Sequence, residues 1–281
     1  MKTFYIEKMD KHRFTIFKTK IENDNLKIYA DLEKIKNIKS IVKKLIKCEA
    51  TNVVLSRELC ENKNLINALN SNNIRIFDGR WLEKYISFEL LDYIIRQNSL
   101  KKEEIEIAIT TNEITDISIE TIKVLAKQYK RVTVVTNHIE KLRKIEKEIY
   151  EKNGILIVIS NNEKKSLIRP KIILNLDFNK EVLNRYKINE NAVIINLEGN
   201  MRIYSKRFNG ININDYEIEV GREETIWREN MQKFKTKDLL EANLYMKDTF
   251  KHIRSKIAKN KVSIKEVFGI NGKIFNQWWK I

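Results

Sequence analysis

The chain has 281 residues, and its 42% hydrophobic share beside 33% charged residues excludes global disorder, because it supplies enough apolar material for packed cores. The formal charge of +16 can attract nucleic acid or an anionic surface, although the lysines are spread along the chain and form no basic arm. Two cysteines, Cys48 and Cys60, are too few for a disulfide framework or a paired-cysteine metal site. With no signal-peptide core and no long apolar run, the sequence favours a cytoplasmic protein that does not enter a membrane.

Residues 1–100 predict a small α/β domain. Alternating apolar residues predict an antiparallel three-stranded meander, with strands at 3–6, 14–17 and 26–29. Short apolar runs then alternate with helical periodicity, which predicts parallel β-α-β pairing with helices at about 32–47 and around 65–69 and strands at 52–55 and 74–77. The segment 80–97 is apolar nearly all round, so we expect a helix that is covered on most sides.

Residues 101–200 carry the clearest pattern, which is that of a Rossmann-like domain. Charged residues at 101–104 mark its boundary. Nearly continuous runs rich in Ile and Val begin at Ile105, Val132, Ile155, Ile172 and Ala192. Strands of this kind are buried on both faces, so the pattern predicts a doubly wound parallel sheet with helices on each side.

Residues 201–281 predict a hairpin followed by helices. Asn209-Gly210 between two apolar runs favours a type I′ turn, because these residues accept a positive φ. Helical periodicity predicts one long helix over about 237–259, and the run 263–266 has the pattern of a capping box for a final short helix. We interpret Phe275 and Trp278-Trp279 as docking the tail onto its own domain or a partner, with base stacking as the alternative.

The run 132–138, VTVVTNH, resembles the second strand of the NAD(P)-binding domain in the shikimate dehydrogenase and glutamyl-tRNA reductase group, which ends in an Asn-Arg-Thr turn. The following helix, around 140–145, is similar to the next helix of that group. The strand that ends at Asn175 is similar to the strand that lines its nicotinamide side. The resemblance implies a Rossmann fold and NAD(P) as the cofactor over about a third of the chain.

The turn after the first strand of this domain departs from that group. Residues 110–116 contain no glycine, whereas the family carries glycines there so that the backbone can approach a pyrophosphate. Glu113 and Asp116 place negative charge where phosphates would bind, although Asp116 is alternatively a helix N-cap. The catalytic lysine motif of the shikimate dehydrogenases contains a proline, and the one proline here is Pro170. We therefore expect no cofactor, with NAD(P) as the alternative.

Polar residues follow the predicted strands, where the carboxyl ends of a parallel sheet form a crevice. The candidate binding residues are Thr110, Thr111, Asn112, Thr136, Asn137, Ser160, Asn161 and Asn175. Lys164 and Lys165 could meet an anion after the third strand, in a loop that is equally well a solvated turn. The three histidines lie too far apart for zinc ligands, so we predict no metal site and no catalytic residue.

These observations leave three classes of function. A non-catalytic or regulatory protein that binds a small anion or a protein partner is favoured, because the fold pattern is present and its cofactor motif is not. An atypical NAD(P)-dependent oxidoreductase is the enzyme alternative. A nucleic-acid-binding protein is the third, driven by the charge of +16. The basic residues of the long helix could form a basic stripe or a solvated face; they are Lys247, Lys251, Arg254, Lys256, Lys259 and Lys261.

Overall fold

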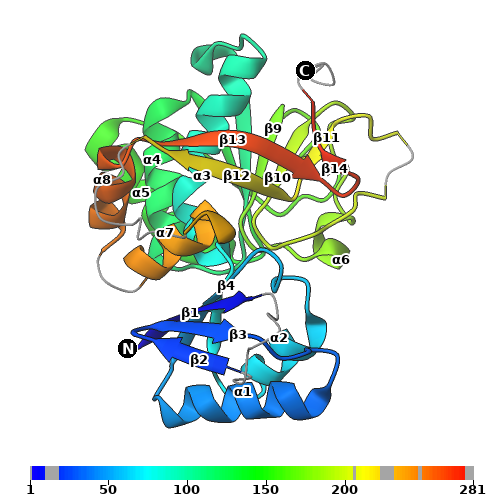
Figure 1. The fold of residues 1–281 in the computed structure, drawn as a ribbon. Helices are drawn as coiled ribbons and strands as arrows, with labels where there is room; N and C mark the ends of the chain where they lie inside the picture. The colour runs from blue at the N-terminus through cyan, green and yellow to red at the C-terminus, as the bar shows by residue number, and fades with distance from the viewer. Residues whose placement is uncertain (1, 10–18, 205–206, 222–230, 246–248, 276–281) are drawn as a thin grey trace. The chain divides into compact units, whose positions relative to one another are not determined.

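The computed structural model describes residues 2–9, 19–204, 207–221, 231–245 and 249–275 (Figure 1). The chain divides into two compact units, Met1–Leu82 with Arg222–Asp248 and Glu83–Gly221 with Thr249–Ile281. These limits differ from those of the three segments expected from the sequence, which were 1–100, 101–200 and 201–281. Residues 222–248 join the first unit, and most of helix α3 (Arg80–Gln97) belongs to the second.

The first unit is built on a five-stranded sheet in the order β2-β3-β1-β4-β5. Its strands are β1 (Thr3–Lys8), β2 (Thr19–Glu22), β3 (Asn25–Ile28), β4 (Asn52–Leu55) and β5 (Arg75–Phe77). β1 pairs in parallel with both β3 and β4, and β2 pairs with β3 antiparallel. The expected antiparallel meander is therefore wrong, because β1 carries apolar side chains on both faces and takes a central position in the sheet. The strand expected at 14–17 lies outside the described residues.

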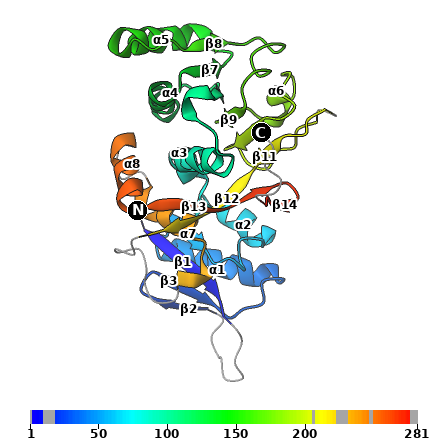
Figure 2. The ribbon, with the colours of Figure 1, turned by 90° about the horizontal axis from the view of Figure 1, so that it is seen from above.

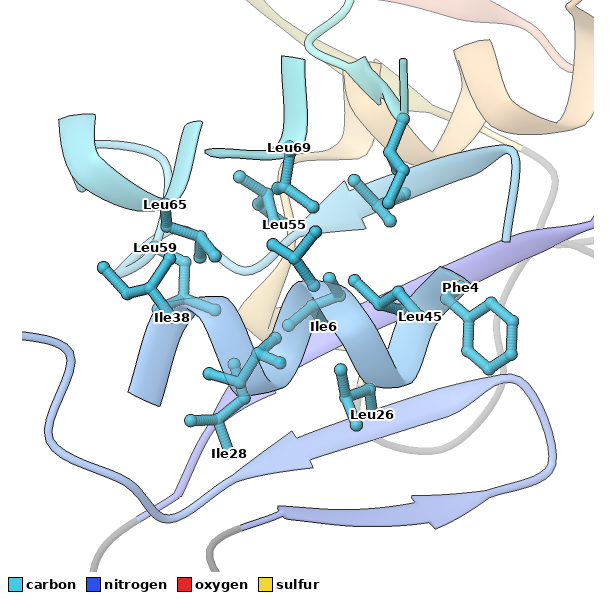
Figure 3. Packing of buried hydrophobic residues seen from close by; sticks show 14 of the residues in the cluster. Phe4, Ile6, Leu26, Ile28, Ile38, Leu45, Leu55, Leu59, Leu65 and Leu69 are labelled. Atoms are coloured by element: carbon cyan, nitrogen blue, oxygen red, sulfur yellow. The ribbon is translucent and has the colours of Figure 1, made fainter. Parts of the chain in front are cut away.

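One face of this sheet is covered by the two expected helices, α1 (Ile35–Lys47) and α2 (Lys63–Asn70). Leu45 of α1 and Leu69 of α2 belong to the same buried cluster as Phe4 of β1 (Figure 3). Burial of each such side chain contributes about 1.5–3 kcal/mol. Cys48 and Cys60 are partly buried against this core. Burial raises the pKa of the Cys60 thiol to about 11, so this thiol is protonated at neutral pH.

The other face is covered by the returning segment, which contains the 3₁₀ turn η2 (Met231–Lys233) and helix α7 (Thr236–Leu244). Phe234, Leu239 and Tyr245 pack against Val54 and Phe77 of the sheet. The Tyr245 ring lies edge-on to the Phe77 ring, with 5.2 Å between centroids. The sheet of the first unit is thus buried on both faces.

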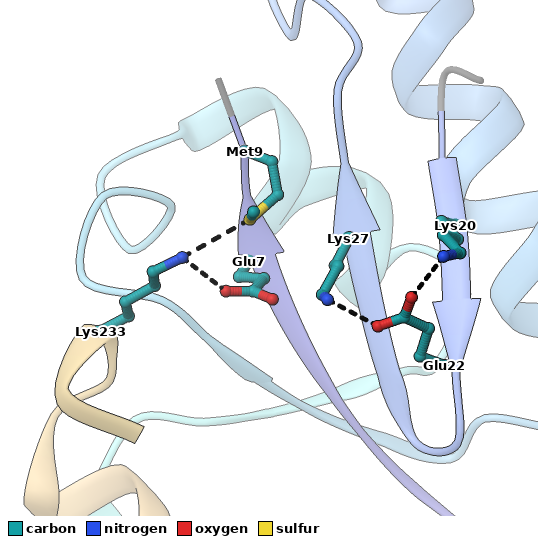
Figure 4. Close-up of polar contacts among 6 residues, drawn as sticks. All are labelled: Glu7, Met9, Lys20, Glu22, Lys27 and Lys233. Atoms are coloured by element: carbon teal, nitrogen blue, oxygen red, sulfur yellow. Dashed lines mark hydrogen bonds and ion pairs between the residues drawn. The ribbon is translucent and has the colours of Figure 1, made fainter. Parts of the chain in front are cut away.

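Ion pairs join the returning segment to β1 and tie together the β2–β3 hairpin (Figure 4). Lys233 Nζ donates to Glu7 Oε2 at 2.9 Å, and Glu7 is only 7% exposed. Glu22 lies between Lys20 and Lys27, and hydrogen bonds from both ammonium groups lower the pKa of its carboxyl to about 2. Because Glu22 is solvent-accessible, this second set of pairs adds little to stability.

Helix α7 also carries a buried carboxyl group, Glu241, which is 1% exposed. The Gly79 backbone N–H donates a hydrogen bond to this carboxyl, while Glu241 Oε2 has no partner among the described residues. Burial first, and then the carboxylates of Asp78 and Asp238, raise the pKa of Glu241 to about 8. Gly79 has a φ of +82°, and a Cβ there would lie 2.4 Å from the Lys237 side chain, so only glycine fits beside this helix.

The second unit is built on a six-stranded sheet in the order β11-β10-β9-β6-β7-β8. Its strands are β6 (Glu106–Thr110), β7 (Arg131–Val135), β8 (Val158–Ser160), β9 (Ile172–Asn175), β10 (Val193–Asn196) and β11 (Ile211–Ile213). Each neighbouring pair is parallel. Numbered from β6, the order is 3-2-1-4-5-6, which is the doubly wound Rossmann order. The predicted fold class is confirmed.

Helices lie on both sides of this sheet. The charged residues before β6 form the short 3₁₀ helix η1 (Lys102–Glu104), and α4 (Asp116–Gln128) and α5 (Ile139–Asn153) follow the next two strands. The short helix α6 (Lys180–Leu183) lies on the side of the sheet opposite to α4 (Figure 2). Its Leu183 packs with Phe178, Ala108 and Ile194 in one cluster.

The hairpin expected at Asn209-Gly210 does not form. β11 pairs with β10 in parallel, and the run before the expected turn, residues 202–204, is not a strand. Gly210 serves another purpose, because a Cβ there would lie 2.1 Å from the backbone oxygen of Ala192. The missing side chain lets the chain approach β10, where the Ile211 N–H donates to that oxygen at 3.0 Å.

A third sheet forms where the sequence predicted the final short helix. β12 (Asp215–Val220) pairs antiparallel with β13 (Val262–Gly269), and β13 with β14 (Gly272–Lys273). The expected capping box at 263–266 lies inside β13, because Val262, Ile264 and Val267 bury one face of that strand. The single helix expected at 237–259 is two helices, α7 in the first unit and α8 (Phe250–Lys259) in the second. Trp278 and Trp279, which were expected to dock the tail, lie outside the described residues.

No helix within the described residues is long and apolar enough to cross a membrane.

We expect the Glu241→Gln substitution to increase stability at alkaline pH and not at acidic pH. The folded protein holds a proton on Glu241 up to a pKa of about 8, whereas the unfolded chain releases it near the ordinary value of 4.5. Stability is therefore lost as pH rises between these two values. Above pH 8 the variant should be more stable by on the order of 3 kcal/mol, and near pH 4 the two proteins should be equal.

Urea unfolding at several pH values measures this difference. Glu61→Gln is the matched control, because Glu61 is exposed and belongs to the same unit. A pH-independent difference between the Glu241→Gln variant and the unmodified protein would contradict the buried-acid assignment.

Candidate functional site

The carboxyl ends of the strands in the second unit bring several of the expected binding residues together. Thr110 ends β6 and Asn175 ends the adjacent β9, and the Thr110 hydroxyl donates to Asn175 Oδ1 at 2.6 Å. Asn112, just after β6, accepts a hydrogen bond on its Oδ1 from the Asn137 backbone N–H at 2.9 Å. These contacts follow from the doubly wound topology, which places the ends of neighbouring strands at one edge.

The other expected residues are buried in the protein or turned into their own loops. Thr111 and Thr136 are fully buried, and the Thr136 N–H donates to the Ser160 carbonyl at 3.0 Å. Ser160 Oγ lies 2.8 Å from Ser166 Oγ, within the same loop. Asn161 is exposed, and its side chain makes no hydrogen bond with any residue that the structure describes.

A carboxylate occupies the turn that follows β6. Asp177 Oδ1 accepts from the Asn112 N–H at 2.7 Å, and Asp177 Oδ2 accepts from the Glu113 N–H at 2.7 Å. The Thr111 hydroxyl donates to the same Oδ2 at 2.7 Å. In dinucleotide-binding domains the backbone N–H groups of this turn point at the pyrophosphate. Here the N–H groups of Asn112 and Glu113 donate to a side chain of the same protein, the carboxylate of Asp177.

The helix after this turn is capped by Thr115. Thr115 Oγ1 accepts from the Ser118 N–H at 3.3 Å, and Ser118 Oγ accepts from the Thr115 N–H at 2.9 Å, which completes a capping box. Asp116, which was the alternative N-cap, is instead the first helical residue, where its charge suits the helix dipole. The start of α4 therefore has its own acceptors as well.

Buried asparagines form a hydrogen-bonded row at the carboxyl ends of β9, β10 and β11. Asn175 Nδ2 donates to Asn196 Oδ1 at 3.2 Å, and Asn196 Nδ2 donates to Asn214 Oδ1 at 3.0 Å. Asn214 pairs in turn with the Met201 backbone, accepting from its N–H and donating to its carbonyl, both at 3.1 Å. Buried amides satisfied in this way hold loops in place, and they leave few groups for a ligand.

The polar side chains at these strand ends are paired or exposed in the part of the chain that the structure describes. In the part of the chain that the structure describes, no buried side-chain polar atom at these ends lacks a hydrogen-bond partner. His138 is exposed at the start of α5, and Lys164 and Lys165 are exposed in the loop after β8. No cluster of His, Cys, Asp and Glu in the described residues could hold a metal ion.

Asp177, which accepts the three hydrogen bonds at this turn, was not among the binding residues predicted from the sequence. A signal for it was present. Asp177 follows the end of the fourth strand by two residues, and in a doubly wound sheet that strand lies beside the first. An acid at that position beside a turn without glycine can replace the phosphate that the turn would otherwise bind.

No protein-family model matches the chain, and no curated protein matches it. Among solved structures, a shikimate dehydrogenase in complex with NADP+ is 14% identical with a TM-score of 0.34, over 68% of this chain and 74% of that one. An L-tryptophan dehydrogenase from Nostoc punctiforme is 8% identical with a TM-score of 0.32, over 60% of this chain and 49% of that one. A putative aspartate carbamoyltransferase from Trypanosoma cruzi is 10% identical with a TM-score of 0.27, over 69% of each chain. The Rossmann-like resemblance expected from the sequence is confirmed for the fold, by the strand order.

We expect Asp177→Ala to destabilise the protein and to make its stability depend on small anions. The substitution leaves the N–H groups of Asn112 and Glu113 without their acceptor, whereas the Thr111 hydroxyl keeps the Glu113 carbonyl at 3.0 Å. The loss should be about 2–4 kcal/mol, because these hydrogen bonds are charge-assisted. Formate or acetate can fill the space and restore part of that loss.

Thermal unfolding with and without formate measures the effect. Glu181→Ala is the matched control, because it removes an exposed carboxylate from the same unit. If formate raised the melting temperature of the unmodified protein, the control and the Asp177→Ala variant equally, the carboxylate would not be acting as an internal ligand.

Proposed function

We propose that this protein is a non-catalytic binding protein whose Rossmann-like unit no longer accepts a dinucleotide. Its ligand is a small anion or a protein partner. The observation that carries the proposal is the Asp177 carboxylate on the backbone N–H groups of Asn112 and Glu113. Because a side chain of the same protein accepts from these N–H groups, the turn is occupied without a ligand.

Charge and geometry both act against a pyrophosphate at this turn. A phosphate would have to displace Asp177 from three hydrogen bonds, each of 2.7 Å, before it reached the same donors. If it bound alongside, it would meet the carboxylate at close range, with a repulsion of at least about 1 kcal/mol per charge pair in water and more where solvent is excluded. Side chains on every residue of the turn also keep a phosphate from the backbone.

The alternative is an atypical NAD(P)-dependent oxidoreductase, which the strand order favours because that order is the one found in dinucleotide-binding domains. For this alternative the Asp177 side chain would have to rotate away from the turn when the cofactor binds. The two proposals therefore differ in one measurable quantity, the affinity of the unmodified protein for NAD(P).

We expect that NAD, NADP and their reduced forms, at about 1 mM, neither raise the melting temperature of the unmodified protein nor give a calorimetric signal. A ligand that binds only the folded state at ten times its Kd would stabilise by about 1.4 kcal/mol, which a thermal shift detects. Asp177→Gly is the informative variant, because it removes the carboxylate and supplies a residue without a Cβ. A micromolar Kd for NAD or NADP with the unmodified protein would refute the proposal and favour the oxidoreductase alternative.

A further inference from the structure

Helices α4, α5 and α8 of the second unit line a groove with a volume of about 440 Å³. Sites for small molecules fall in the range of about 300–1,000 Å³, so the groove has room for a ligand of that size. On α5 the lining residues come from its last two turns, from Glu148 to Asn153. The strand-end turn lies at the opposite ends of the helices that follow β6 and β7, so the groove is a separate place on this unit.

Cations outnumber acids along this groove. The cations are Lys123, Lys127, Lys152, Lys251 and Arg254, and the acids are Glu120 and Glu148. Glu148 Oε1 lies 3.1 Å from Lys123 Nζ and 2.9 Å from Lys152 Nζ, and hydrogen bonds from both lysines hold the pKa of Glu148 below its ordinary value. Lys123 also lies 3.8 Å from Glu120. The acids of the groove are thus engaged by two of its lysines.

Two lysines remain. Lys127 of α4 and Lys251 of α8 are exposed, and neither forms an ion pair with a residue that the structure describes. They come from different helices and line the same groove. An anion that enters it therefore meets two ammonium groups whose charge no described carboxylate offsets.

Arg254 adds a cation whose position is fixed. Its Nη1 donates to the Tyr85 carbonyl and to Glu89 Oε2, both at 2.6 Å. Its guanidinium carbon lies 4.6 Å from the centroid of the Phe88 ring. A planar guanidinium held by these contacts keeps further N–H donors in a set direction, so little rotamer entropy is lost when an oxyanion binds.

The groove also has an apolar wall, formed by Val124, Ile149 and Phe250. The Phe250 ring is itself supported, with its centroid 5.5 Å from that of Tyr85 and 6.3 Å from that of Phe88. An aromatic side chain held in this way offers a planar ring a surface for offset or edge contact. Positive charge and a rigid apolar wall together select a ligand that carries both an anionic group and a ring.

We propose that this groove binds a small phosphate monoester that carries a planar ring, of the class of the nucleoside monophosphates. A phosphate monoester carries a charge of about −1.5 to −2 at neutral pH, which matches the two lysines without an ion pair. The inference rests on the proposed function, since it names the ligand class and the place for a protein that binds a small anion.

Isothermal titration calorimetry on the full chain tests this, with adenosine 5′-monophosphate as the probe and with adenosine and inorganic phosphate as separate arms. At an ionic strength of about 25 mM, surface electrostatics are weakly screened. The monophosphate should bind at least about tenfold more tightly than either adenosine or phosphate alone, because each lacks one half of the recognition. Equal affinity for phosphate and the monophosphate, or no binding of the monophosphate, overturns the proposal.

The double substitution Lys127→Glu with Lys251→Glu should lower the affinity for the monophosphate at least about tenfold. Lys127→Ala with Lys251→Ala should lower this affinity less. Lys171→Glu with Lys187→Glu is the matched control, because it makes the same change of charge at exposed lysines outside the groove. Thermal unfolding of each variant verifies that it is folded. Equal weakening by the control pair would show a general charge effect and overturn the proposal, as would tighter binding of a short single-stranded oligonucleotide through the same lysines.

The failure of this inference can be separated from the failure of the proposed function. Monophosphate that bound at the strand ends would be insensitive to the Lys127 and Lys251 substitutions, and this result overturns the groove alone. Binding of NAD or NADP by the unmodified protein overturns the proposed function by a separate titration.

Discussion

The Asp177 carboxylate accepts three hydrogen bonds at the turn after β6 and so joins two neighbouring strand ends of the second unit. A parallel doubly wound sheet gathers backbone N–H groups at the carboxyl ends of its strands, and each of these groups forms a hydrogen bond with an acceptor or with water. In a dinucleotide-binding domain the cofactor supplies that acceptor. In this protein Asp177 supplies it, with contacts of 2.7 Å to both Asn112 and Glu113. The same contacts join the turn after β6, which leads into α4, to the connection that leaves β9.

Buried polar groups are satisfied to different degrees at two places in the protein. At the strand ends of the second unit, Asn175, Asn196 and Asn214 satisfy one another and the backbone, which makes the network rigid. In the first unit, Glu241 is buried beneath α7 with one oxygen that has no partner among the described residues, and its pKa is raised to about 8. A satisfied amide network costs little to keep, whereas a carboxyl group in this setting is tolerated by remaining protonated. The stability of the returning segment that carries α7 therefore depends on pH. Among the residues that the structure describes, the strand ends of the Rossmann-like unit contain no buried acidic side chain.

The lysines that give the chain its net charge of +16 do not all have the same consequence for binding. Many lysines are paired with neighbouring acids, as Lys123 and Lys152 are with Glu148, and such pairs at the surface contribute little energy. What matters for binding is where cations from separate helices converge on one hollow without enough carboxylates to neutralise them. Lys127 and Lys251 are in that position, and Arg254 is held between Glu89 and the ring of Phe88 beside them.

Local patterns were sufficient for those elements whose residues determine their own conformation. Helices α1 and α2 follow from apolar periodicity, the helix over residues 80–97 from its nearly continuous apolar composition, and four of the five expected strands of the second unit from their Ile- and Val-rich runs. The run from Ile155 differs, because its strand is β8 (Val158–Ser160) and Val158 is 59% exposed at the edge of the sheet. The same patterns did not determine which segments of the chain pair with one another. The strand at 3–8 pairs in parallel at the centre of a sheet, Asn209-Gly210 enters a parallel strand, and the run 262–269 is a strand and not a capped helix, because pairing with distant segments outweighed local turn and capping preferences.

The sequence by itself determined the fold class of the second unit and the absence of a glycine-rich turn, since both are properties of consecutive residues. Only the tertiary structure decided what replaced the glycines, which elements share a unit and where positive charge gathers. Asp177 and Asn112 are 65 residues apart, and Lys127 and Lys251 are farther apart still. Such groups meet only because strand order and helix packing bring them together, and no local pattern records a contact that depends on the path of the whole chain.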